Sequence, residues 1–250
     1  MSYDYMGPFD FPCLNPKSYL ELPSPPKPAG IQISVCASTW KRGKELIITS
    51  IESIYKQSFP VENYEVILVD DNTEGAERED LKEAVSYLLR EYPDRYFRAY
   101  FTSYTRCWND AHTLNVAFKR ALGWIIMQSQ VDLLHAGETL ESAWRHHNHN
   151  RQLRLCPAQY GAWKLLDTDG PKWPYFPHEF GASWRKDCVH KVKGRNETII
   201  VAPPDVDFQG AMRDTCGLVA MEDPQVRTLH RANTHPVSYT HLTLPTNREV

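Results

Sequence analysis

Apolar residues in the first half of the chain follow two periods that alternate along the sequence. Short apolar runs of the kind found in strands alternate with stretches in which apolar residues recur every three or four positions, as in amphipathic helices. The short runs predict strands over 31–37, 65–69, 96–101 and 124–128, and the longer stretches predict helices over 43–57, 80–92 and 110–122. This alternation predicts an α/β fold with a largely parallel sheet that is covered by helices on both faces.

The flanking segments have a different character. Prolines crowd residues 1–30, and because proline lacks a backbone donor, we expect an extended leader that wraps the domain. Beyond residue 150 the periodicity weakens. There we expect irregular structure with short strands over 160–184 and a last helix over 205–216.

We expect residues 31–236 to form a single domain, in which 31–135 and 136–236 are the two halves. The tail that follows has another origin, because the sequence VSYTHLTLPT at 237–246 resembles the translation of a transposase adapter used in sequencing libraries. Residues 237–250 are therefore expected to be read-through rather than native protein, and the native C-terminus to be missing.

Composition narrows the classes of function. The formal net charge is −3, from 28 Lys and Arg against 31 Asp and Glu, which gives no general attraction to nucleic acid or anionic membranes. No apolar run approaches the roughly 20 residues of a membrane span. The 6 cysteines include no Cys-x-x-Cys pair, a scatter that favours reduced, buried thiols over a disulfide framework or a zinc site. We expect a protein of the cytoplasm or of the membrane periphery, with no transmembrane segment and no nucleic-acid partner.

Polar residues gather where the predicted strands end. Ser38 and Trp40 follow the first strand, and the adjacent acids Asp70 and Asp71 follow the second. Residues 130–132 (Gln-Val-Asp) follow the fourth strand. In open α/β sheets, ligands bind beyond the carboxyl ends of the strands. These side chains are therefore predicted to share one binding site.

In this order and spacing, the residues resemble the inverting family 2 glycosyltransferases of GT-A fold, and the resemblance runs from about residue 31 to residue 235. It implies a GT-A sheet and transfer of a sugar from a nucleotide-diphosphate sugar, such as a UDP- or GDP-sugar, to an unidentified hydroxyl acceptor with inversion. The matching parts are the segment 38–42, the helix with Leu46, Ser53, Ile54 and Gln57, the strand end Val69-Asp70-Asp71, and the stretch with Asn115, Ala117, Ala121 and Gly123.

The resemblance also implies a nucleotide-binding set. Trp40 would stack on the base, and Asp71 would accept a hydrogen bond from it. Asp70 would instead shape the turn. The set is completed by Ser38, Arg42 and Asn115.

The family's metal motif, Asp-x-Asp, corresponds to Gln130-Val131-Asp132, in which an amide replaces the first acid. Mg²⁺ and Mn²⁺ prefer oxygen ligands, and one carboxylate with diphosphate oxygens and water can hold them. The resemblance therefore implies a Mg²⁺ or Mn²⁺ site with Asp132 and Gln130, to which His230 is added from the C-terminal segment. Arg231 is an alternative contact to the phosphates, and His135 is expected to be structural.

Inverting transfer needs a general base for the acceptor hydroxyl. The family takes it from a Gly-x-x-Glu…Glu-Asp-x-Asp region, to which Gly194–Glu197 and residues 204–207 (Pro-Asp-Val-Asp) correspond, with proline in place of the first acid of the second part. This implies Asp205 as the base, with Asp207 as the second choice. Asp205 also opens the predicted helix, where its function could be to cap the N-terminus.

Other functions share this sheet type. A glycosyltransferase-like module that binds a nucleotide or glycan without turnover stays open as the alternative, because Gln130 and Pro204 stand where acids are expected. Sugar nucleotidyltransferases and nicotinamide-dependent enzymes need a glycine-rich loop after the first strand. Segment 38–43 contains one glycine, and both of these classes are therefore disfavoured.

Overall fold

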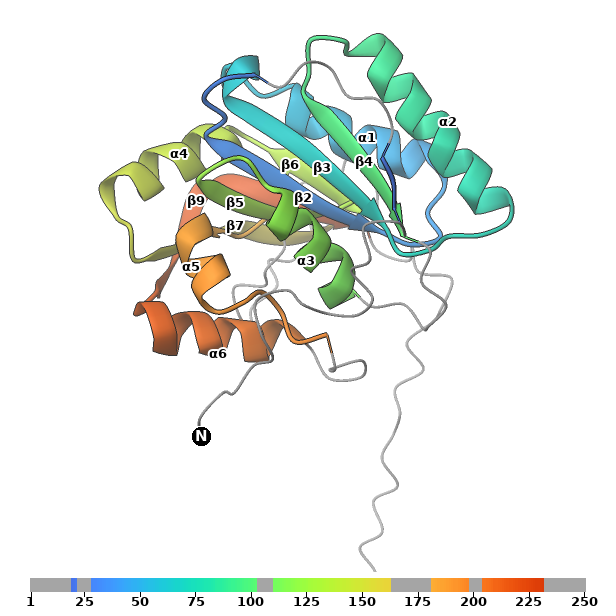
Figure 1. Ribbon diagram of the computed structural model, residues 1–250. Coiled ribbons are helices and arrows are strands. Elements are labelled where there is room, and N and C mark those ends of the chain that lie inside the picture. The colour runs from blue at the N-terminus through green and yellow to red at the C-terminus, as the bar shows by residue number, and fades with distance from the viewer. Residues whose placement is uncertain (1–18, 22–27, 103–109, 163–180, 198–203, 232–250) are drawn as a thin grey trace, which may run out of the picture.

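The computed structural model describes residues 19–21, 28–102, 110–162, 181–197 and 204–231. Its first half contains the predicted alternation of strands and helices (Figure 1). The elements are β2 (Ile33–Thr39), α1 (Lys44–Tyr55), η2 (Val61–Asn63), β3 (Tyr64–Asp70), α2 (Ala76–Glu91), β4 (Phe97–Thr102), α3 (Asp110–Arg120) and β5 (Ile125–Gln130).

The largest shift in a predicted boundary is at the start of α2. The helix begins at Ala76 rather than at Asp80. It follows Gly75 directly, whose φ of 69° turns the chain from the loop after β3 into the helix. Glu77 and Glu79 lie in the first turn, where carboxylates interact favourably with the helix dipole.

The second half adds β6 (Leu133–Ala136), α4 (Thr139–His149), β7 (Leu153–Ala162), β8 (Ser183–Arg185), α5 (Lys186–Lys191), α6 (Pro204–Cys216) and β9 (Val219–Arg231). The predicted last helix is confirmed as α6, which ends at Cys216 and is followed by Gly217, whose φ is 64°. Strand β9 was not predicted, because Pro224 and several charged residues interrupt its alternation. Most of the segment expected to be irregular, 160–184, lies outside the described residues.

The described strands form one sheet in the order β1-β4-β3-β2-β5-β8-β7-β9-β6. Its central strands β4, β3, β2 and β5 are parallel, and Ile33 of β2 pairs with Tyr64 on one side and Ile125 on the other. Their carboxyl ends therefore lie at one edge of the sheet (Figure 1). β1 (Tyr19–Glu21), from the proline-rich leader, runs antiparallel to β4 at the outer side.

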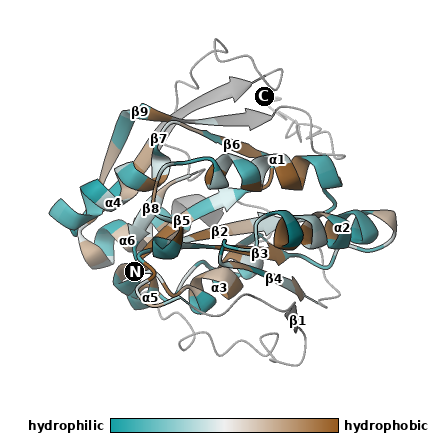
Figure 2. Ribbon diagram, turned by 90° about the horizontal axis from the view of Figure 1, so that it is seen from above, coloured by the Kyte–Doolittle hydropathy of each residue, from teal (hydrophilic) through white to brown (hydrophobic). Residues whose placement is uncertain are grey.

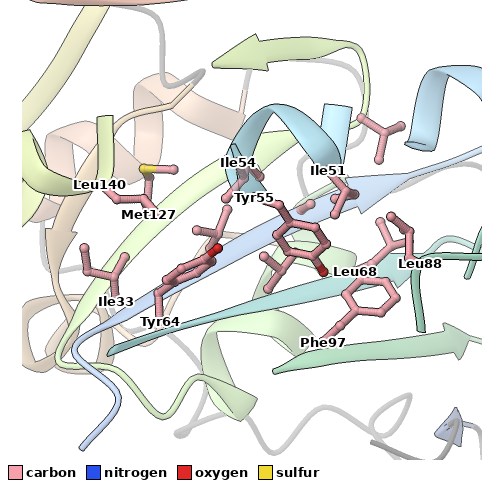
Figure 3. Close-up of a cluster of buried hydrophobic side chains, with 14 of the residues drawn as sticks. Ile33, Ile51, Ile54, Tyr55, Tyr64, Leu68, Leu88, Phe97, Met127 and Leu140 are labelled. Atoms are coloured by element: carbon pink, nitrogen blue, oxygen red, sulfur yellow. The ribbon is translucent and has the colours of Figure 1, made fainter. Parts of the chain in front are cut away.

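Helices cover both faces of the central sheet. Over one face, α1 and α2 pack on a cluster of buried side chains that includes Ile54, Leu68 and Leu88 (Figure 3). On the other face α3, α5 and α6 cover a second cluster, in which the rings of Phe118 and Phe208 are stacked with centroids 6.1 Å apart. The core thus fixes the two halves of the chain to the same sheet.

Hydropathy follows this layering. In Figure 2 hydrophilic residues are prominent along α2 and α4, whereas the central strands β2 and β3 are mainly hydrophobic. Within the described ranges, no helix has the length and apolar character needed to cross a bilayer.

The prediction of reduced thiols is wrong for one pair of cysteines. Cys188 of α5 and Cys216 of α6 form a disulfide. They are 28 residues apart in sequence, so no local spacing signals the bond, which depends on the packing of α5 against α6. Cys36 and Cys156 are buried free thiols, as expected, and the remaining cysteines lie outside the described residues.

Candidate functional site

The turn after β3 is held by Asp70, the last residue of that strand. Its Oδ2 accepts a hydrogen bond from the Thr73 backbone N at 2.9 Å, and its Oδ1 accepts one from Thr73 Oγ1 at 2.5 Å. Arg78 Nη1 lies 3.3 Å from Oδ2. Asp70 therefore shapes the turn, as predicted. Burial raises the pKa of this carboxyl, although the bonds from Thr73 and the charge of Arg78 oppose the rise.

The loop after β2 is fastened to the same turn. The Lys41 backbone N donates to Thr73 Oγ1 at 2.9 Å, and the Asp71 backbone N donates to the Thr39 carbonyl at 3.0 Å. Asp71 is buried, and Trp40 is half-buried with Lys41 Nζ 4.8 Å from its ring centroid. The structure thus brings Trp40 and Asp71 to one edge of the sheet, and their contacts to a nucleotide stay a prediction.

Arg42 and Asp132 form a buried ion pair across this edge. Arg42 follows β2, whereas Asp132 lies in the turn between β5 and β6. Arg42 Nη2 donates to Asp132 Oδ2 at 3.2 Å, and the two side chains are 8% and 2% exposed. Such a pair interacts more strongly than a pair in water, because the surrounding dielectric is lower. A residue predicted to bind the nucleotide therefore contacts one predicted to bind the metal.

The turn that carries Asp132 is anchored to α1. Ser50 Oγ donates to the Leu133 carbonyl at 2.8 Å, and the His135 backbone N donates to Ser53 Oγ at 3.0 Å. The His135 ring is buried with Nε2 2.8 Å from Ser129 Oγ. Burial lowers the pKa of this imidazole to about 4, so it is neutral at pH 7. These bonds agree with the structural role expected for His135.

The oxygen donors around Asp132 decide whether this edge suits a divalent cation. Asp132 supplies a carboxylate, and Gln130 supplies a half-buried amide. His230 of β9 pairs with Leu133, the residue after Asp132, and its side chain lies outside the described part. Among the described residues, no group of three or more His, Cys, Asp or Glu side chains could hold a metal. This sparse oxygen set fits Mg²⁺ or Mn²⁺ when a bound diphosphate supplies further oxygens.

Ser38 belongs to a buried polar network at the end of β2. Ser38 Oγ donates to Asp110 Oδ1 at 2.5 Å, and Asp110 Oδ2 lies 3.7 Å from Arg195 Nη1. Arg195 Nη2 donates to Gln128 Oε1 at 2.5 Å. None of these four side chains is more than 8% exposed. We call Ser38, Asp110, Gln128 and Arg195 the Arg195 network.

Sequence reasoning missed most of this network. Asp110 enters the sequence analysis only as the first residue of a predicted helix, and Arg195 only as an unassigned position within the Gly194–Glu197 match. A charged residue between a glycine and an acid was the available signal, but nothing local indicated its partners, because Gln128 lies 67 positions away.

Asn115 holds the segment that contains Arg195. Its Nδ2 donates to the Arg195 carbonyl and to Glu197 Oε1, both at 2.8 Å, and its Oδ1 accepts from the Arg195 backbone N at 2.7 Å. Glu197 Oε2 lies 3.1 Å from His112 Nδ1. Asn115 is fully buried, so these bonds fix residues 194–197 against α3. Its predicted contact to a nucleotide stays a prediction.

The two catalytic candidates lie in the first turn of α6. Asp207 is half-buried, and the side chain of Asp205 lies outside the described part. Next to Asp207, Phe208 packs edge-on against Trp184, with centroids 5.5 Å apart. Phe208 is 1% exposed, so it anchors this end of the helix in the core. The catalytic roles of Asp205 and Asp207 stay predictions.

Comparison with known families gives one match. The sequence model of glycosyl transferase family 2 matches residues 34–186, which is more than half of the chain. The match covers the loop after β2, the turn after β3 and the Asp132 turn. A comparison with curated protein sequences gave no match.

Solved structures with the same arrangement include S. aureus TarS, which superposes with a TM-score of 0.64 at 17% identity over 80% of this chain and 37% of that one. The mannosyltransferase PcManGT from Pyrobaculum calidifontis, in complex with GDP-Man and Mn²⁺, has a TM-score of 0.59 at 19% identity over 82% of this chain and 58% of that one. TarS 1–349 with UDP-GlcNAc has a TM-score of 0.62 at 18% identity over 80% and 59%. The chain thus spans less than two thirds of each neighbour. The likeness confirms the predicted GT-A type fold.

Proposed function

Because the chain belongs to glycosyl transferase family 2, we propose that it transfers a sugar from a nucleotide-diphosphate sugar to a hydroxyl group, with inversion at the anomeric carbon. One observation carries the proposal: Trp40, Asp71 and the Arg42–Asp132 pair meet at one sheet edge from the ends of three strands. The neighbours support the donor class, since TarS has been solved with UDP and with UDP-GlcNAc, and PcManGT with GDP-Man.

The donor would bind across the loops after β2 and β3. The half-buried Trp40 ring offers a stacking surface for the base, and the Asp71 carboxylate offers it a hydrogen-bond acceptor. Arg42 provides a cation for the diphosphate, since a guanidinium matches phosphate oxygens well. Ser38 and Asn115 complete the proposed nucleotide site. Ser38 is held by a hydrogen bond to Asp110 of α3, and Asn115 by a hydrogen bond to the carbonyl of Arg195.

Asp132, Gln130 and His230 are the proposed protein ligands of Mg²⁺ or Mn²⁺. Such an ion would neutralise the diphosphate and stabilise it as a leaving group. The Mn²⁺ in the PcManGT complex supports the use of a divalent ion.

Asp205 is the proposed general base, and Asp207 is the second candidate. The carboxylate would take the proton of the acceptor hydroxyl as the hydroxyl oxygen bonds to the anomeric carbon. The bond from that carbon to the diphosphate oxygen breaks on the opposite side, and the nucleoside diphosphate leaves with the electron pair. Anchoring of Phe208 in the core would keep this end of α6 in place during the reaction.

The alternative is a module of the same fold that binds a nucleotide or glycan without turnover. Its motivation is the replacement of expected acids by Gln130 and Pro204. Fold alone does not distinguish the two, because function depends on the site.

Calorimetric titration of the full chain with UDP, GDP and CDP, each with and without Mn²⁺, tests the donor site. We expect one nucleotide to bind in a manner that depends on Mn²⁺. Asp71→Asn should weaken that binding about tenfold, because it removes a charge-assisted hydrogen bond, and Asp132→Ala should abolish the dependence on Mn²⁺. Asp94→Asn is the matched control, since Asp94 is an exposed acid between α2 and β4.

Release of nucleoside diphosphate from UDP- and GDP-sugars then separates the enzyme from the binding module. Slow hydrolysis of the donor that is lost in Asp205→Asn, with nucleotide affinity unchanged, would support the transferase. Metal-independent nucleotide binding without any hydrolysis would support the module. A folded chain that binds none of the three nucleotides would contradict both.

A further inference from the structure

We propose that Arg195 couples the donor-binding edge of the sheet to α6, so that nucleotide binding orders the helix that carries Asp205 and Asp207. The inference rests on the proposed function and deepens it by naming a positioning residue. Arg195 would act through the residues that its side chain contacts, which are Asp110, Gln128 and Phe208.

On the donor side, Arg195 reaches the end of β2 through one intermediate. Its Nη1 lies 3.7 Å from Asp110 Oδ2, and Asp110 Oδ1 accepts the 2.5 Å hydrogen bond of Ser38. Ser38 is two residues before Trp40, in the strand whose end carries the donor loop. A change at this loop therefore alters the position of Asp110, and with it the electrostatic environment of the guanidinium.

On the sheet, Arg195 is fixed to β5 two residues before that strand ends. Nη2 donates to Gln128 Oε1 at 2.5 Å, and Gln130 ends the strand just before the Asp132 turn. Arg195 is 1% exposed. At such depth its position depends on the partners of its guanidinium, because a buried charge that loses its partner is strongly destabilising.

On the opposite side, the guanidinium lies over an aromatic ring of α6. The Arg195 Cζ is 5.3 Å from the centroid of Phe208, a distance typical of a cation–π contact. Phe208 directly follows Asp207 and also contacts Phe118 and Trp184. A movement of the guanidinium is therefore transmitted to the first turns of α6.

The backbone of Arg195 cannot follow such a movement freely. Asn115 bonds both the N and the carbonyl of Arg195, and the Glu197–His112 pair holds the next residues against α3. With the main chain fixed at α3, any adjustment on nucleotide binding would fall to the contacts of the side chain. Arg195 therefore works as a bridge between Asp110 and Phe208, and loss of the bridge should uncouple them.

A residue that only stabilises the fold would behave differently, and the chain offers a matched case. Arg98 is also a buried arginine, 7% exposed, with an acid partner in Glu65. It lies near the start of β4, at the sheet edge opposite the proposed site. Arg195→Lys and Arg98→Lys are therefore equivalent changes in chemistry with different expected consequences.

Hydrogen–deuterium exchange of α6 with and without the nucleotide that binds, UDP or GDP with Mn²⁺, tests the coupling. In the wild type we expect nucleotide to slow exchange of the α6 amides by about threefold or more. Arg195→Lys should lose this response while its nucleotide affinity stays within about threefold. Arg98→Lys should keep it. Because the comparison is between bound and free states of each variant, a uniform loss of stability does not reproduce the result.

Donor hydrolysis provides a second readout. Arg195→Lys should lower kcat about tenfold with the KM for the donor within about threefold, since the lost interaction acts on the catalytic helix rather than on binding. If Arg195→Lys does not fold, Phe208→Leu takes its place, because it removes the ring under the guanidinium and leaves the donor edge intact.

Unchanged α6 exchange in a wild-type chain that binds nucleotide would overturn the coupling and leave the proposed function standing. Retention of the response in a folded Arg195→Lys or Phe208→Leu chain would do the same. Absence of nucleotide binding by the wild type would instead overturn the proposed function, and the coupling with it.

Discussion

Helix α3 meets a buried arginine at each of its ends, and the two arginines draw their partners from different parts of the chain. At the C-terminal end, Arg98 Nη2 donates to the Arg120 carbonyl at 2.7 Å and to Glu65 at 2.5 Å. Glu65 and Arg98 come from the neighbouring strands β3 and β4. At the N-terminal end, Asp110 interacts with Arg195, which lies on a segment far along the chain.

The difference separates the part of the fold that supports the sheet from the part that joins the two halves of the chain. Glu65 Oε1 also accepts hydrogen bonds from Ser34 Oγ at 2.5 Å and from the Leu122 backbone N at 2.6 Å. Every member of this network is thus within or beside the central strands, away from the carboxyl edge. The Arg195 network instead contacts β2, β5, α3 and α6, which are the elements that surround the proposed site.

The comparison predicts its largest effect for Glu65→Ala. The substitution leaves the Arg98 guanidinium buried without its acid partner, so the free energy of unfolding should fall by about 3–5 kcal/mol. Urea denaturation at pH 7 measures the loss. The double variant Glu65→Met with Arg98→Met should recover much of it, because well-packed apolar residues replace a buried ion pair at little cost.

Nucleotide affinity of the folded fraction provides the control for Glu65→Ala. It should stay within about twofold of the wild type, since distant sites are close to additive. A selective loss of nucleotide binding would show that the amino edge also belongs to the functional site, and the distinction between the two networks would then fail.

The two networks also show which features of the fold could be predicted from the sequence alone. The strands and helices from residue 31 to residue 128 follow from local periodicity, and Asp70 was correctly assigned to its turn because Thr73 is a near neighbour in sequence. The contacts of Arg195 could not be predicted from the sequence, because its side chain and its backbone bond to residues 67 and 80 positions away. The same holds for the Cys188–Cys216 disulfide, whose pairing depends on helix packing.

The motif resemblance predicted the location of residues whose position follows from the order of the strands. It placed Trp40, Asp71 and Asp132 at one edge because each follows a strand of the parallel sheet, and topology then brings them together. It did not indicate that Arg42 would pair with Asp132, or that Asn115 would be used by segment 194–197. Both are tertiary contacts between residues of ordinary local character.

A prediction of intermediate size concerns the effect of pH on the stability of the folded chain. Burial lowers the pKa of His135 to about 4 from an ordinary value of 6.5. Between these pH values the unfolded chain binds a proton that the folded chain does not. Stability is therefore full above about pH 6.5 and falls as the pH drops towards 4, by about 2 kcal/mol at pH 5 for this group.

Urea denaturation at pH 7 and pH 5 tests this dependence. His135→Gln should lose about 2 kcal/mol less than the wild type between the two pH values, because glutamine does not titrate there. His147 is the matched case, as burial also lowers its pKa to about 4 and its Nε2 lies 3.0 Å from Ser183 Oγ. An equal acid-induced loss in wild type and His135→Gln would contradict the neutral buried imidazole.

The smallest expected effect concerns Arg42. Its ion pair with Asp132 should differ from the Glu65–Arg98 pair because ligands can replace either partner. Arg42 is paired with Asp132, so it would compete with a divalent cation for that carboxylate. With the proposed donor bound, the guanidinium would have a second anionic partner in the diphosphate. Arg42→Met should thus change the affinities for the two ligands in opposite directions, whereas Glu65→Ala should change neither.

Titration of the nucleotide-free chain with Mn²⁺ should show tighter binding in Arg42→Met than in the wild type, and titration with the preferred nucleotide should show binding about tenfold weaker, or roughly 1.4 kcal/mol. Arg42→Lys keeps the charge and should lie between the two for both ligands. Parallel losses of both affinities would mean that Arg42 and Asp132 support the local fold as Arg98 and Glu65 do. Opposite changes would mean that Arg42 and Asp132 exchange their mutual ion pair for contacts with a ligand.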